Sequence, residues 1–399
     1  MRVRYLPSTT TAPQLAGQEA GRDRFLDCLR SGSLLIVVLW HWGMTLLFWH
    51  VDDAPHATHP LAYTGELWLL TWVFQVVPVF FFVGGAVHLR AWRRWRDPDG
   101  RLALFVRRRL FHLVVPGILV LLAWAALTPV LAWRYGTGTA LGTAELVISP
   151  LWFLAVYLMV VALLPVGLRW RRQPAVRVLP WFVLMAALVD VVRHIVPAVG
   201  WLNLLVVWGL AYQAGLFYDR LTSGSRWLSA GLLGGGLVGL VGLVTLAGYP
   251  GSMVGMPGDR WSNMAPPTLA VVALLSVQVG LIGLLRPVAE RWVSGRRPAA
   301  VIDFLGRYAL GLFLCHSSGM AAYRYLLWLF TGGGLDPVPP DLTWWLSRPV
   351  AVVGSLVCTV PLVYVFARWG GPFGERLWRR LPDRRAVGLS GGDGHAGTS

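Results

Sequence analysis

Lysine is absent from this chain of 399 residues, and charged residues of any kind make up only 14% of it. Soluble domains average roughly 25% charged residues, so the composition excludes an ordinary soluble protein. Apolar residues reach 56% and form runs close to the roughly 20 residues that a membrane-spanning helix needs. The sequence therefore predicts an all-α, polytopic membrane protein.

Cysteine is almost absent as well. The three cysteines, Cys28, Cys315 and Cys358, all fall within or beside apolar runs. Their spacing indicates neither a disulfide framework nor a zinc site, and no metal site of another kind is predicted. Free cysteine usually behaves as a small buried apolar residue. We expect three inert, buried thiols.

The apolar runs predict about ten membrane-spanning helices. Only a short stretch around Pro197 and Gly200 separates the fifth run from the sixth. The predicted spans are 31–50, 66–89, 110–132, 151–168, 176–196, 200–218, 227–247, 266–285, 304–330 and 346–368.

The net charge of +16 comes entirely from arginine, which raises the question of nucleic-acid binding. The arginines gather in alternate connections, at 90–109, 169–177, 286–307 and 376–385. The other connections, near 51–65, 133–149, 249–265 and 331–345, hold only Arg134 and Arg260. Basic residues concentrate in the cytoplasmic loops of membrane proteins. The pattern therefore indicates topology instead of nucleic-acid binding, and it predicts that both termini are cytoplasmic.

The chain divides into one large unit and two tails. We expect a flexible cytoplasmic N-terminal tail at 1–21, a transmembrane unit at 22–370, and a basic, Gly/Ser-rich cytoplasmic tail at 371–399. No cleavable signal peptide is expected, because about thirty polar and mixed residues precede the first apolar run. No internal repeat is found.

Two ionisable residues stand out on the first predicted helix. Eleven steps of 100° bring His41 to within about 20° of Arg30, roughly 16 Å further along the helix. Ionisable side chains inside a membrane are costly, so each indicates a functional site. Asp27 lies three residues before Arg30 and can pair with it. The alternatives are an arginine that anchors the helix at the lipid phosphates and a histidine that hydrogen-bonds between helices.

Other polar residues lie on later helices. His316 is predicted near the middle of the ninth span. Cys315 beside it cannot form a Cys–His pair within the helix, because adjacent helical residues do not face each other. Asp190, Arg193 and His194 are spaced as a polar cluster that satisfies itself. The segment from 260 to 269 has little helix propensity and is a candidate cover for a cavity.

Several segments, in this order, resemble the integral-membrane acyltransferase family called acyltransferase-3. They are RFLDCLRSGSLLIVVLWHW with its Arg-x10-His spacing, VPVFFFVGGAV, RRRLFHLVVP, SPLWFL and RYALGLFLCH. The resemblance covers about 22–368 and implies that Arg30 and His41 are the family's essential first-helix pair. Arg109 matches the first arginine of an Arg-x-x-Arg motif, whose second arginine is His112 here. Gly84-Gly85 stands where the family usually has Ser-Gly.

The resemblance implies transfer of an acyl group, often acetyl, from cytoplasmic acyl-CoA to a hydroxyl of a glycan, glycolipid or small molecule. Acyl-CoA is then a donor substrate, with no permanently bound cofactor. We predict that His41 accepts the acceptor proton, directly or through an acyl-enzyme-like step, and that His316 helps to bind or polarise the thioester. The predicted donor-binding residues are Arg30, Arg107, Arg108, Arg109 and His112, since guanidinium groups match phosphate oxygens.

Two other classes of function remain open at this point. A proton-coupled transporter or lipid flippase also places ionisable residues within the membrane, although the inverted repeat of many transporters is not found. A membrane scaffold without enzymatic activity is the third class. The lysine-free composition, rich in arginine, alanine and glycine, is typical of GC-rich bacterial genomes, so we expect a bacterial plasma-membrane protein.

Overall fold

A computed structural model describes residues 23–49, 55–95, 101–256, 259, 261–332 and 336–380. The structure is 82% helical and contains ten helices long and apolar enough to cross a membrane. The predicted all-α, ten-span architecture is therefore confirmed. The predicted tail at 1–21 lies outside the described residues. Of the predicted tail at 371–399, residues Gly371–Arg380 form a helix and 381–399 lie outside the described residues.

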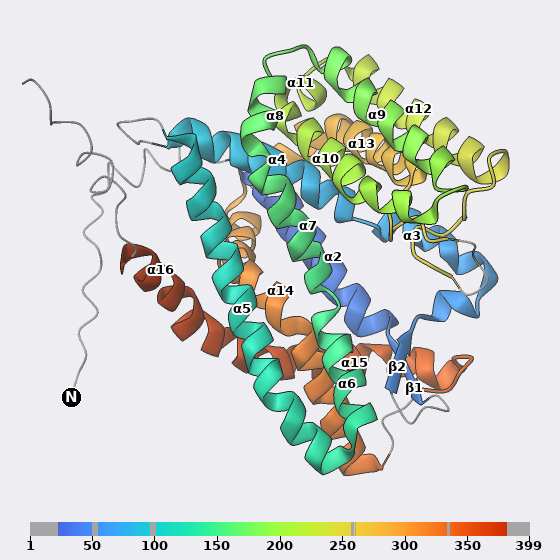
Figure 1. Ribbon diagram of the computed structural model, residues 1–399, viewed down its shortest axis with the longest axis vertical. Coiled ribbons are helices and arrows are strands. Elements are labelled where there is room, and N and C mark those ends of the chain that lie inside the picture. Colours follow the sequence, from blue (N-terminus) through green and yellow to red (C-terminus); the bar gives the residue numbers. More distant parts are fainter. Residues whose placement is uncertain are drawn as a thin grey trace, which may run out of the picture.

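The helices follow one another with short connections (Figure 1). They are α2 (Arg24–Met44), α3 (Leu70–Phe74), α4 (Val77–Arg94), α5 (Leu102–Tyr135), α6 (Thr137–Ile148), α7 (Leu151–Ala162), α8 (Leu164–Trp170), α9 (Ala175–Val192), α10 (Asn203–Leu216), α11 (Tyr218–Thr222), α12 (Arg226–Thr245), α13 (Leu269–Val293), α14 (Arg296–Thr331), α15 (Leu342–Val365) and α16 (Gly371–Arg380). Short 3-10 segments occupy Pro60–Ala62, Gly65–Leu69 and Pro197–Leu202, and a π-helical turn occupies Phe366–Gly370.

The first span ends earlier than predicted. Helix α2 stops at Met44, and the strand β1 (Leu46–Trp49) follows, where the apolar pattern had predicted helix to residue 50. β1 pairs antiparallel with β2 (Pro55–Thr58), with Leu46 opposite Thr58. An apolar run fits a strand as well as a helix, and the partner strand decides between them.

The fourth span begins earlier than predicted. Residues 133–149 were expected to form a loop, but α5 continues to Tyr135 and α6 begins at Thr137. The chain reverses at Gly136, whose φ of 91° suits a residue without Cβ. Small residues such as Ala140 and Ala144 are then buried on α6.

Large apolar side chains cover much of the outside of the bundle. Val238 is 75% exposed, Val357 is 64% exposed and Trp227 is 86% exposed. Soluble monomers rarely expose extended apolar patches, whereas hydrocarbon solvates such faces. The outer surface therefore agrees with the ten apolar spans, and the protein is a multi-pass membrane protein.

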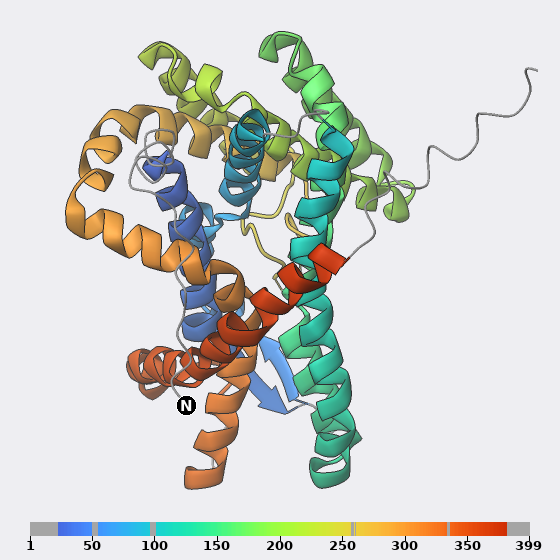
Figure 2. The ribbon, with the colours of Figure 1, turned by 90° about the vertical axis from the view of Figure 1, so that its left-hand side faces the viewer.

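Helix α2 runs through the middle of the bundle, between α4 and α14 (Figure 1). The Asp23 side chain caps its first turn by accepting a 3.0 Å hydrogen bond from the Leu26 backbone N–H. One buried face, including Val38 and Trp42, packs against Met320 of α14. The long helix α14 also packs against α15, and α16 crosses α5 on the outside (Figure 2). This arrangement brings the first and ninth spans together.

The two ends of α2 define the two ends of the bundle. At the arginine-rich end, Arg90 of α4 contacts both Asp23 and Asp219. At the other end, which we call the hairpin end, lie β1 and β2, the described residues that connect α12 with α13, and residues 336–341 before α15 (Figure 1). Direct contacts join these parts: His59 Nε2 lies 2.9 Å from the Gly255 carbonyl oxygen, and the Leu47 N–H donates to the Asp336 carboxylate.

Glycine allows α4 and α10 to pack backbone against backbone. A Cβ atom on Gly215 would overlap the Phe82 carbonyl oxygen, and one on Gly85 would overlap the Tyr212 carbonyl oxygen. Small residues permit such close approach in membrane helix pairs. The pair Gly84-Gly85 therefore has a packing role, and it fixes α10 beside the centre of the bundle.

We predict that Gly215→Ala destabilises the protein, because the new methyl group meets main-chain atoms that cannot rotate away. Overpacking of this kind costs about 1–3 kcal/mol. Gly234→Ala is the matched control, since a Cβ at Gly234 of α12 meets nothing within 4 Å. Thermal unfolding in detergent should show a lower Tm for Gly215→Ala alone. Equal Tm values for the two variants would contradict the close approach.

Candidate functional site

The two histidines predicted from separate spans are in contact. His41 Nδ1 of α2 lies 2.8 Å from His316 Nε2 of α14. Their ring planes differ by 9°, with centroids 5.1 Å apart. Because a hydrogen bond to an imidazole nitrogen follows its in-plane lone pair, this geometry fits two rings side by side in one plane. Trp42 adds a second link by donating to the His316 carbonyl oxygen at 3.0 Å.

The hydrogen-bond partners assign the protons of this pair. His316 Nδ1 lies 2.6 Å from the Phe313 carbonyl oxygen. A carbonyl only accepts, so Nδ1 of His316 carries the hydrogen and Nε2 is the acceptor in the neutral ring. His41 must then donate from Nδ1, which leaves the lone pair of its Nε2 available. The pair thus presents one basic nitrogen, on His41, whose ring orientation is fixed by His316.

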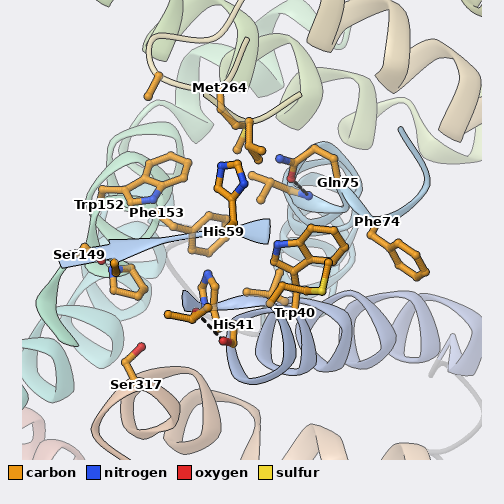
Figure 3. A pocket seen from close by; sticks show the side chains of 18 of the residues that line it. Trp40, His41, His59, Phe74, Gln75, Ser149, Trp152, Phe153, Met264 and Ser317 are labelled. Atoms are coloured by element: carbon orange, nitrogen blue, oxygen red, sulfur yellow. Dashed lines mark hydrogen bonds between the residues drawn. The ribbon is translucent and has the colours of Figure 1, made fainter. Parts of the chain in front are cut away.

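His41 lines a cavity of about 520 Å³ on the hairpin side of the pair (Figure 3). Its walls are largely apolar and include the aromatic residues Trp40, Phe74, Phe80, Trp152, Phe153 and Phe313. The polar groups among the lining residues include His59, Gln75, Ser149 and Ser317. A concave, mostly apolar cavity with a few polar groups is typical of a small-molecule site. His41 therefore lies in the wall of a chamber large enough for a small molecule.

Part of the segment 260–269, which was predicted to cover a cavity, lines this cavity. Ser262, Met264 and Ala265 line it, so the prediction for 260–269 is confirmed for these residues. Asn263 shapes the segment, because its amide donates to the Pro250 and Ser252 carbonyl oxygens at 2.6 and 2.9 Å. Residue 260 lies outside the described residues.

Arg30 lies about 16 Å from His41 along the same helix. Its guanidinium is 3.3 Å from the Asp27 carboxylate, which confirms the predicted pair. The side chain is 33% exposed, while its Nε atom is buried and has no hydrogen-bond partner among the described residues. Arg30 is thus only partly satisfied by the protein.

Arg109 and Arg30, which the sequence predicted to act together, lie in a polar cluster whose other members were not predicted. Both guanidiniums lie in the neighbourhood of Tyr157 of α7 and His88 of α4. His88 Nδ1 lies 2.9 Å from the Tyr212 hydroxyl, and both of these side chains are buried. We call Arg30, His88, Arg109, Tyr157 and Tyr212 the arginine–tyrosine cluster. The sequence signal for His88 was an ionisable residue within the second span, one turn after Gly84.

Gly84 explains how Tyr157 reaches this cluster. A Cβ atom on Gly84 would lie 2.8 Å from the Tyr157 ring and hydroxyl, which is closer than real Cβ atoms come. The glycine that replaces the usual serine of the motif thereby makes room for the tyrosine. This departure from the family pattern has a direct structural reason.

A family model described as an acyltransferase domain matches residues 23–368, nearly the whole chain. The protein belongs to the acyltransferase-3 family. It is therefore a membrane-embedded acyltransferase, as the resemblance of its motifs predicted. No match is found among curated proteins or among solved structures.

The other predicted donor-binding residues of this acyltransferase contact helix α16. His112 Nδ1 lies 2.7 Å from the Arg108 carbonyl oxygen, and Nε2 lies 2.7 Å from the Glu375 carboxylate of α16. Arg108 is 3.8 Å from the same carboxylate. Arg107 stacks over the Trp378 ring at 5.6 Å. These three residues connect α5 with α16, whereas Arg109 faces the cluster.

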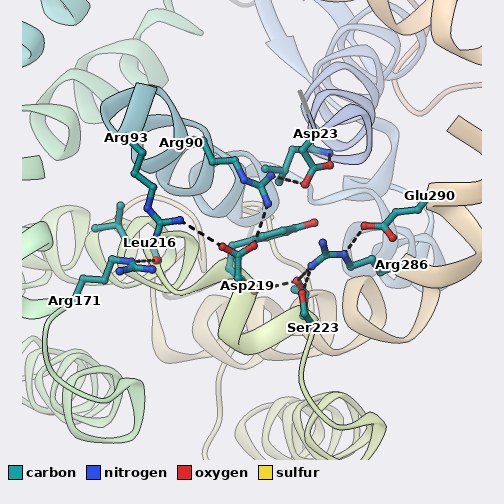
Figure 4. A network of polar contacts seen from close by, with 12 residues as sticks. Asp23, Arg90, Arg93, Arg171, Leu216, Asp219, Ser223, Arg286 and Glu290 are labelled. Carbon is teal, nitrogen blue, oxygen red and sulfur yellow. Dashed lines mark hydrogen bonds and ion pairs between the residues drawn. The ribbon is translucent and has the colours of Figure 1, made fainter. Parts of the chain in front are cut away.

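Further arginines of the acyltransferase are held by structural partners (Figure 4). Arg90 bridges Asp23 and Asp219, and Arg286 contacts Glu290, Thr222 and Ser223. Arg171 donates to the Leu216 carbonyl oxygen at 2.7 Å. Each of these side chains joins two elements at the arginine-rich end. Their contacts indicate a structural role.

The predicted polar cluster is confirmed for Asp190 and Arg193 but not for His194, and Asp190 has further partners from other segments. Its carboxylate accepts hydrogen bonds from Asn203, Tyr249 and the Leu269 N–H at 2.9, 2.9 and 2.7 Å, and it pairs with Arg193 at 3.3 Å. Burial, together with the neighbouring carboxylate, raises the pKa of Tyr249. His194 packs separately, edge-on against the Trp261 ring at 4.6 Å.

All three cysteines are free. The expected burial is confirmed for Cys315 but is wrong for Cys28 and Cys358, which are only half-buried. The adjacent His316 contacts His41, the Phe313 carbonyl and Ser317. Within the described residues, no three His, Cys, Asp or Glu side chains converge to hold a metal ion.

Proposed function

We propose that this acyltransferase moves an acyl group, with acetyl the expected one, from acyl-CoA to a hydroxyl of a glycan, glycolipid or small molecule. One observation carries the proposal. The His41–His316 pair lies between the arginine–tyrosine cluster on one side and the 520 Å³ cavity on the other. We therefore assign the donor to the arginine-rich end and the acceptor to the cavity.

The donor assignment rests on charge. Arg30 and Arg109 bring two positive charges to the cluster, and Asp27 contacts Arg30. Guanidinium groups pair bidentately with phosphate oxygens, and tyrosine hydroxyls can donate to the same oxygens. The phosphates of CoA supply the matching negative charge. The roughly 16 Å from Arg30 to His41 then suits an extended pantetheine arm that leads inward.

Arg107, Arg108 and His112 stay predicted donor-binding residues. Their side chains lie around Glu375 and Trp378 of α16. This position suits contacts with an outer part of CoA instead of the part nearest the thioester. Acyl-CoA enters and leaves as a substrate, so no permanently bound cofactor is proposed.

The proposed reaction uses the free nitrogen of His41. Nε2 accepts the proton of the acceptor hydroxyl while the hydroxyl oxygen attacks the thioester carbonyl carbon. The carbon–sulfur bond then breaks, and the departing CoA sulfur receives the proton from His41. During this step His41 becomes a cation, which its Nδ1 hydrogen bond to His316 stabilises. His316 thus acts by orienting and stabilising His41.

The acceptor assignment rests on the shape and chemistry of the cavity. Aromatic walls offer large apolar surfaces, and a few polar side chains can fix the orientation of hydroxyl groups. His41 contributes to the same wall, so a hydroxyl held in the cavity lies within reach of the base.

The membrane orientation is also part of the proposal. Basic residues favour the cytoplasmic side, which places the arginine-rich end, and both termini, in the cytoplasm where acyl-CoA is available. We propose a bacterial plasma membrane as the location, on the basis of the lysine-free composition. The family match assigns acyl transfer to this fold, and no observation favours the transporter, flippase or scaffold alternatives.

Sealed vesicles test the donor and its side of entry together. Purified protein is reconstituted, and its orientation is determined by protease access to a tag after residue 399. Radiolabelled acetyl-CoA is added only outside the vesicles. A cell extract supplies the hydroxyl acceptors, and it is present both inside and outside the vesicles. We expect alkali-labile label on the acceptors, in proportion to the molecules whose arginine-rich end faces outward. Label in proportion to the opposite orientation would overturn the donor assignment, and unmodified transport without label would overturn the proposed reaction.

A further inference from the structure

A buried ion pair lies at the hairpin end, about two helical turns beyond His316, and does not line the cavity. Arg324 of α14 forms a two-pronged contact with Asp336: NH1 donates to Oδ1 at 3.0 Å and NH2 to Oδ2 at 2.8 Å. The two side chains are 9% and 5% exposed. Such a fork fixes direction as well as distance. No sequence pattern predicted this pair, because Asp336 lies in a connection beyond the ninth span.

The pair holds the end of α2, which is the helix of His41. Arg324 NH2 also donates to the Thr45 carbonyl oxygen at 3.3 Å, and Thr45 caps the C-terminus of α2. The Thr45 hydroxyl in turn donates to the His41 carbonyl oxygen at 2.6 Å. The last carbonyls of a helix need outside partners. Arg324 and Thr45 together satisfy those nearest to His41.

Asp336 holds the residues that follow. Its carboxylate accepts from the Leu47 N–H at 2.8 Å, and its own N–H donates to the Leu47 carbonyl oxygen at 2.7 Å. The chain from His41 to Leu47 is thereby clamped at both Thr45 and Leu47. Arg348 approaches the same carboxylate at 3.6 Å, but its guanidinium also lies 3.9 Å from the centre of the Trp344 ring.

We call the contacts of Arg324 and Asp336 with Thr45 and Leu47 the clamp. Helix α14 supplies both Arg324 of the clamp and His316, the partner of His41. Arg324 follows His316 by eight residues on α14, about 12 Å along the helix. Any movement of α2 against α14 would disturb the His41–His316 contact and the Arg324–Thr45 contact together. These contacts therefore fix the relative position of the two helices about one to two turns beyond the histidine pair, where the proposed reaction transfers a proton.

We propose that Arg324 and Asp336 are positioning residues for acyl transfer, which set the His41–His316 geometry through Thr45 and Leu47. The inference rests on the proposed role of His41 as the base. It predicts a specific kinetic signature. Loss of the clamp lowers kcat, whereas KM for acyl-CoA is unchanged because the arginine–tyrosine cluster lies toward the other end of α2.

The test compares Arg324→Lys and Asp336→Asn with the parent protein. Lysine keeps the charge but loses the planar fork, and asparagine keeps the shape but loses the charge. A displacement of about 1 Å costs on the order of 10²-fold in rate, so we expect kcat per folded molecule to fall by about that factor. Radiolabelled acetyl-CoA is the donor and a cell extract at saturation supplies the acceptors.

Two controls separate position from folding. Arg286→Lys alters an arginine with several partners at the arginine-rich end and is expected to keep the parent kcat and KM. Folded protein is counted by size-exclusion chromatography in detergent, so a loss of stability alone lowers yield and not kcat. A folded Arg324→Lys protein with the parent kcat would overturn the positioning role, and so would equal changes of kcat in the Arg286→Lys control.

His41→Asn is measured in the same assay to keep the two proposals distinct. If the His41→Asn protein is active, His41 is not the base, and the proposed reaction is ruled out. If the His41→Asn protein is inactive while the Arg324→Lys and Asp336→Asn proteins are fully active, only the positioning role is ruled out.

Discussion

His41→Asn is expected to abolish acyl transfer while leaving the protein folded. The asparagine amide can still donate toward His316 from about the position of Nδ1, but it offers no basic nitrogen in place of Nε2. Loss of a general base typically costs about 10² to 10⁴ in rate. The measurement is the initial rate of label transfer from acetyl-CoA to the hydroxyl acceptors of a cell extract, per folded molecule.

A matched control for this variant is His194→Asn. His194 is exposed and packs against the Trp261 ring, so its replacement is expected to keep the parent kcat. The Kd of acetyl-CoA for the His41→Asn protein, measured by equilibrium dialysis, should equal that of the parent protein, because the donor phosphates contact other residues in the proposed complex. A His41→Asn protein with the parent rate would show that another group accepts the proton.

His316→Gln provides the complementary measurement on the same pair. Glutamine keeps a polar group but cannot reproduce an acceptor at Nε2 together with a donor at Nδ1 toward Phe313. Since His316 orients His41 without lining the cavity, its loss is expected to lower kcat less than the loss of His41. The order of the two effects distinguishes the base from its partner.

The sequence predicted those parts of the site that depend on local pattern. The Arg30–Asp27 pair and the alignment of Arg30 with His41 follow from helix geometry alone, and the first is confirmed by a 3.3 Å contact. The ten spans follow from the lengths of the apolar runs. In each case the information lies within about twenty neighbouring residues, which is the length of one span.

The contacts between distant spans could not be predicted in this way. His41 and His316 are separated by 275 residues, and periodicity says nothing about which helices adjoin in the bundle. The same holds for His88 and Tyr212, which meet because Gly85 and Gly215 let α4 and α10 approach. The strand β1 was missed for a related reason, since its pairing with β2 and its anchoring by Asp336 are tertiary effects.

The helical arrangement also divided a motif that reads as one unit in the sequence. Arg107, Arg108, Arg109 and His112 are close along the chain, yet successive residues of a helix point in different directions. Arg109 lies over the Phe105 ring, in the neighbourhood of Tyr157, while Arg108 and His112 contact Glu375. In the proposed function, Arg109 is therefore the residue of this motif that binds the donor together with Arg30.

Replacing Arg30 or Arg109 by glutamine is expected to weaken acetyl-CoA binding strongly. A hydrogen bond to a charged group contributes about 1.5–3 kcal/mol, so each change should lower kcat/KM for acetyl-CoA by about 10- to 100-fold. The physical reason is the loss of a guanidinium that faces the CoA phosphates in the proposed complex. The measurement is the dependence of the initial transfer rate on acetyl-CoA concentration.

Acetyl-pantetheine, which lacks the nucleotide and its phosphates, makes this prediction specific. If Arg30 and Arg109 bind phosphate, the glutamine variants should lose activity with acetyl-CoA but keep the parent kcat/KM with acetyl-pantetheine, so that the two donors become nearly equal. Arg177→Gln, an exposed arginine at the start of α9, should leave the preference for acetyl-CoA intact. Equal losses with both donors would show instead that the two arginines support the structure around Tyr157 and His88, and the donor phosphates would have to be sought at Arg107, Arg108 and His112.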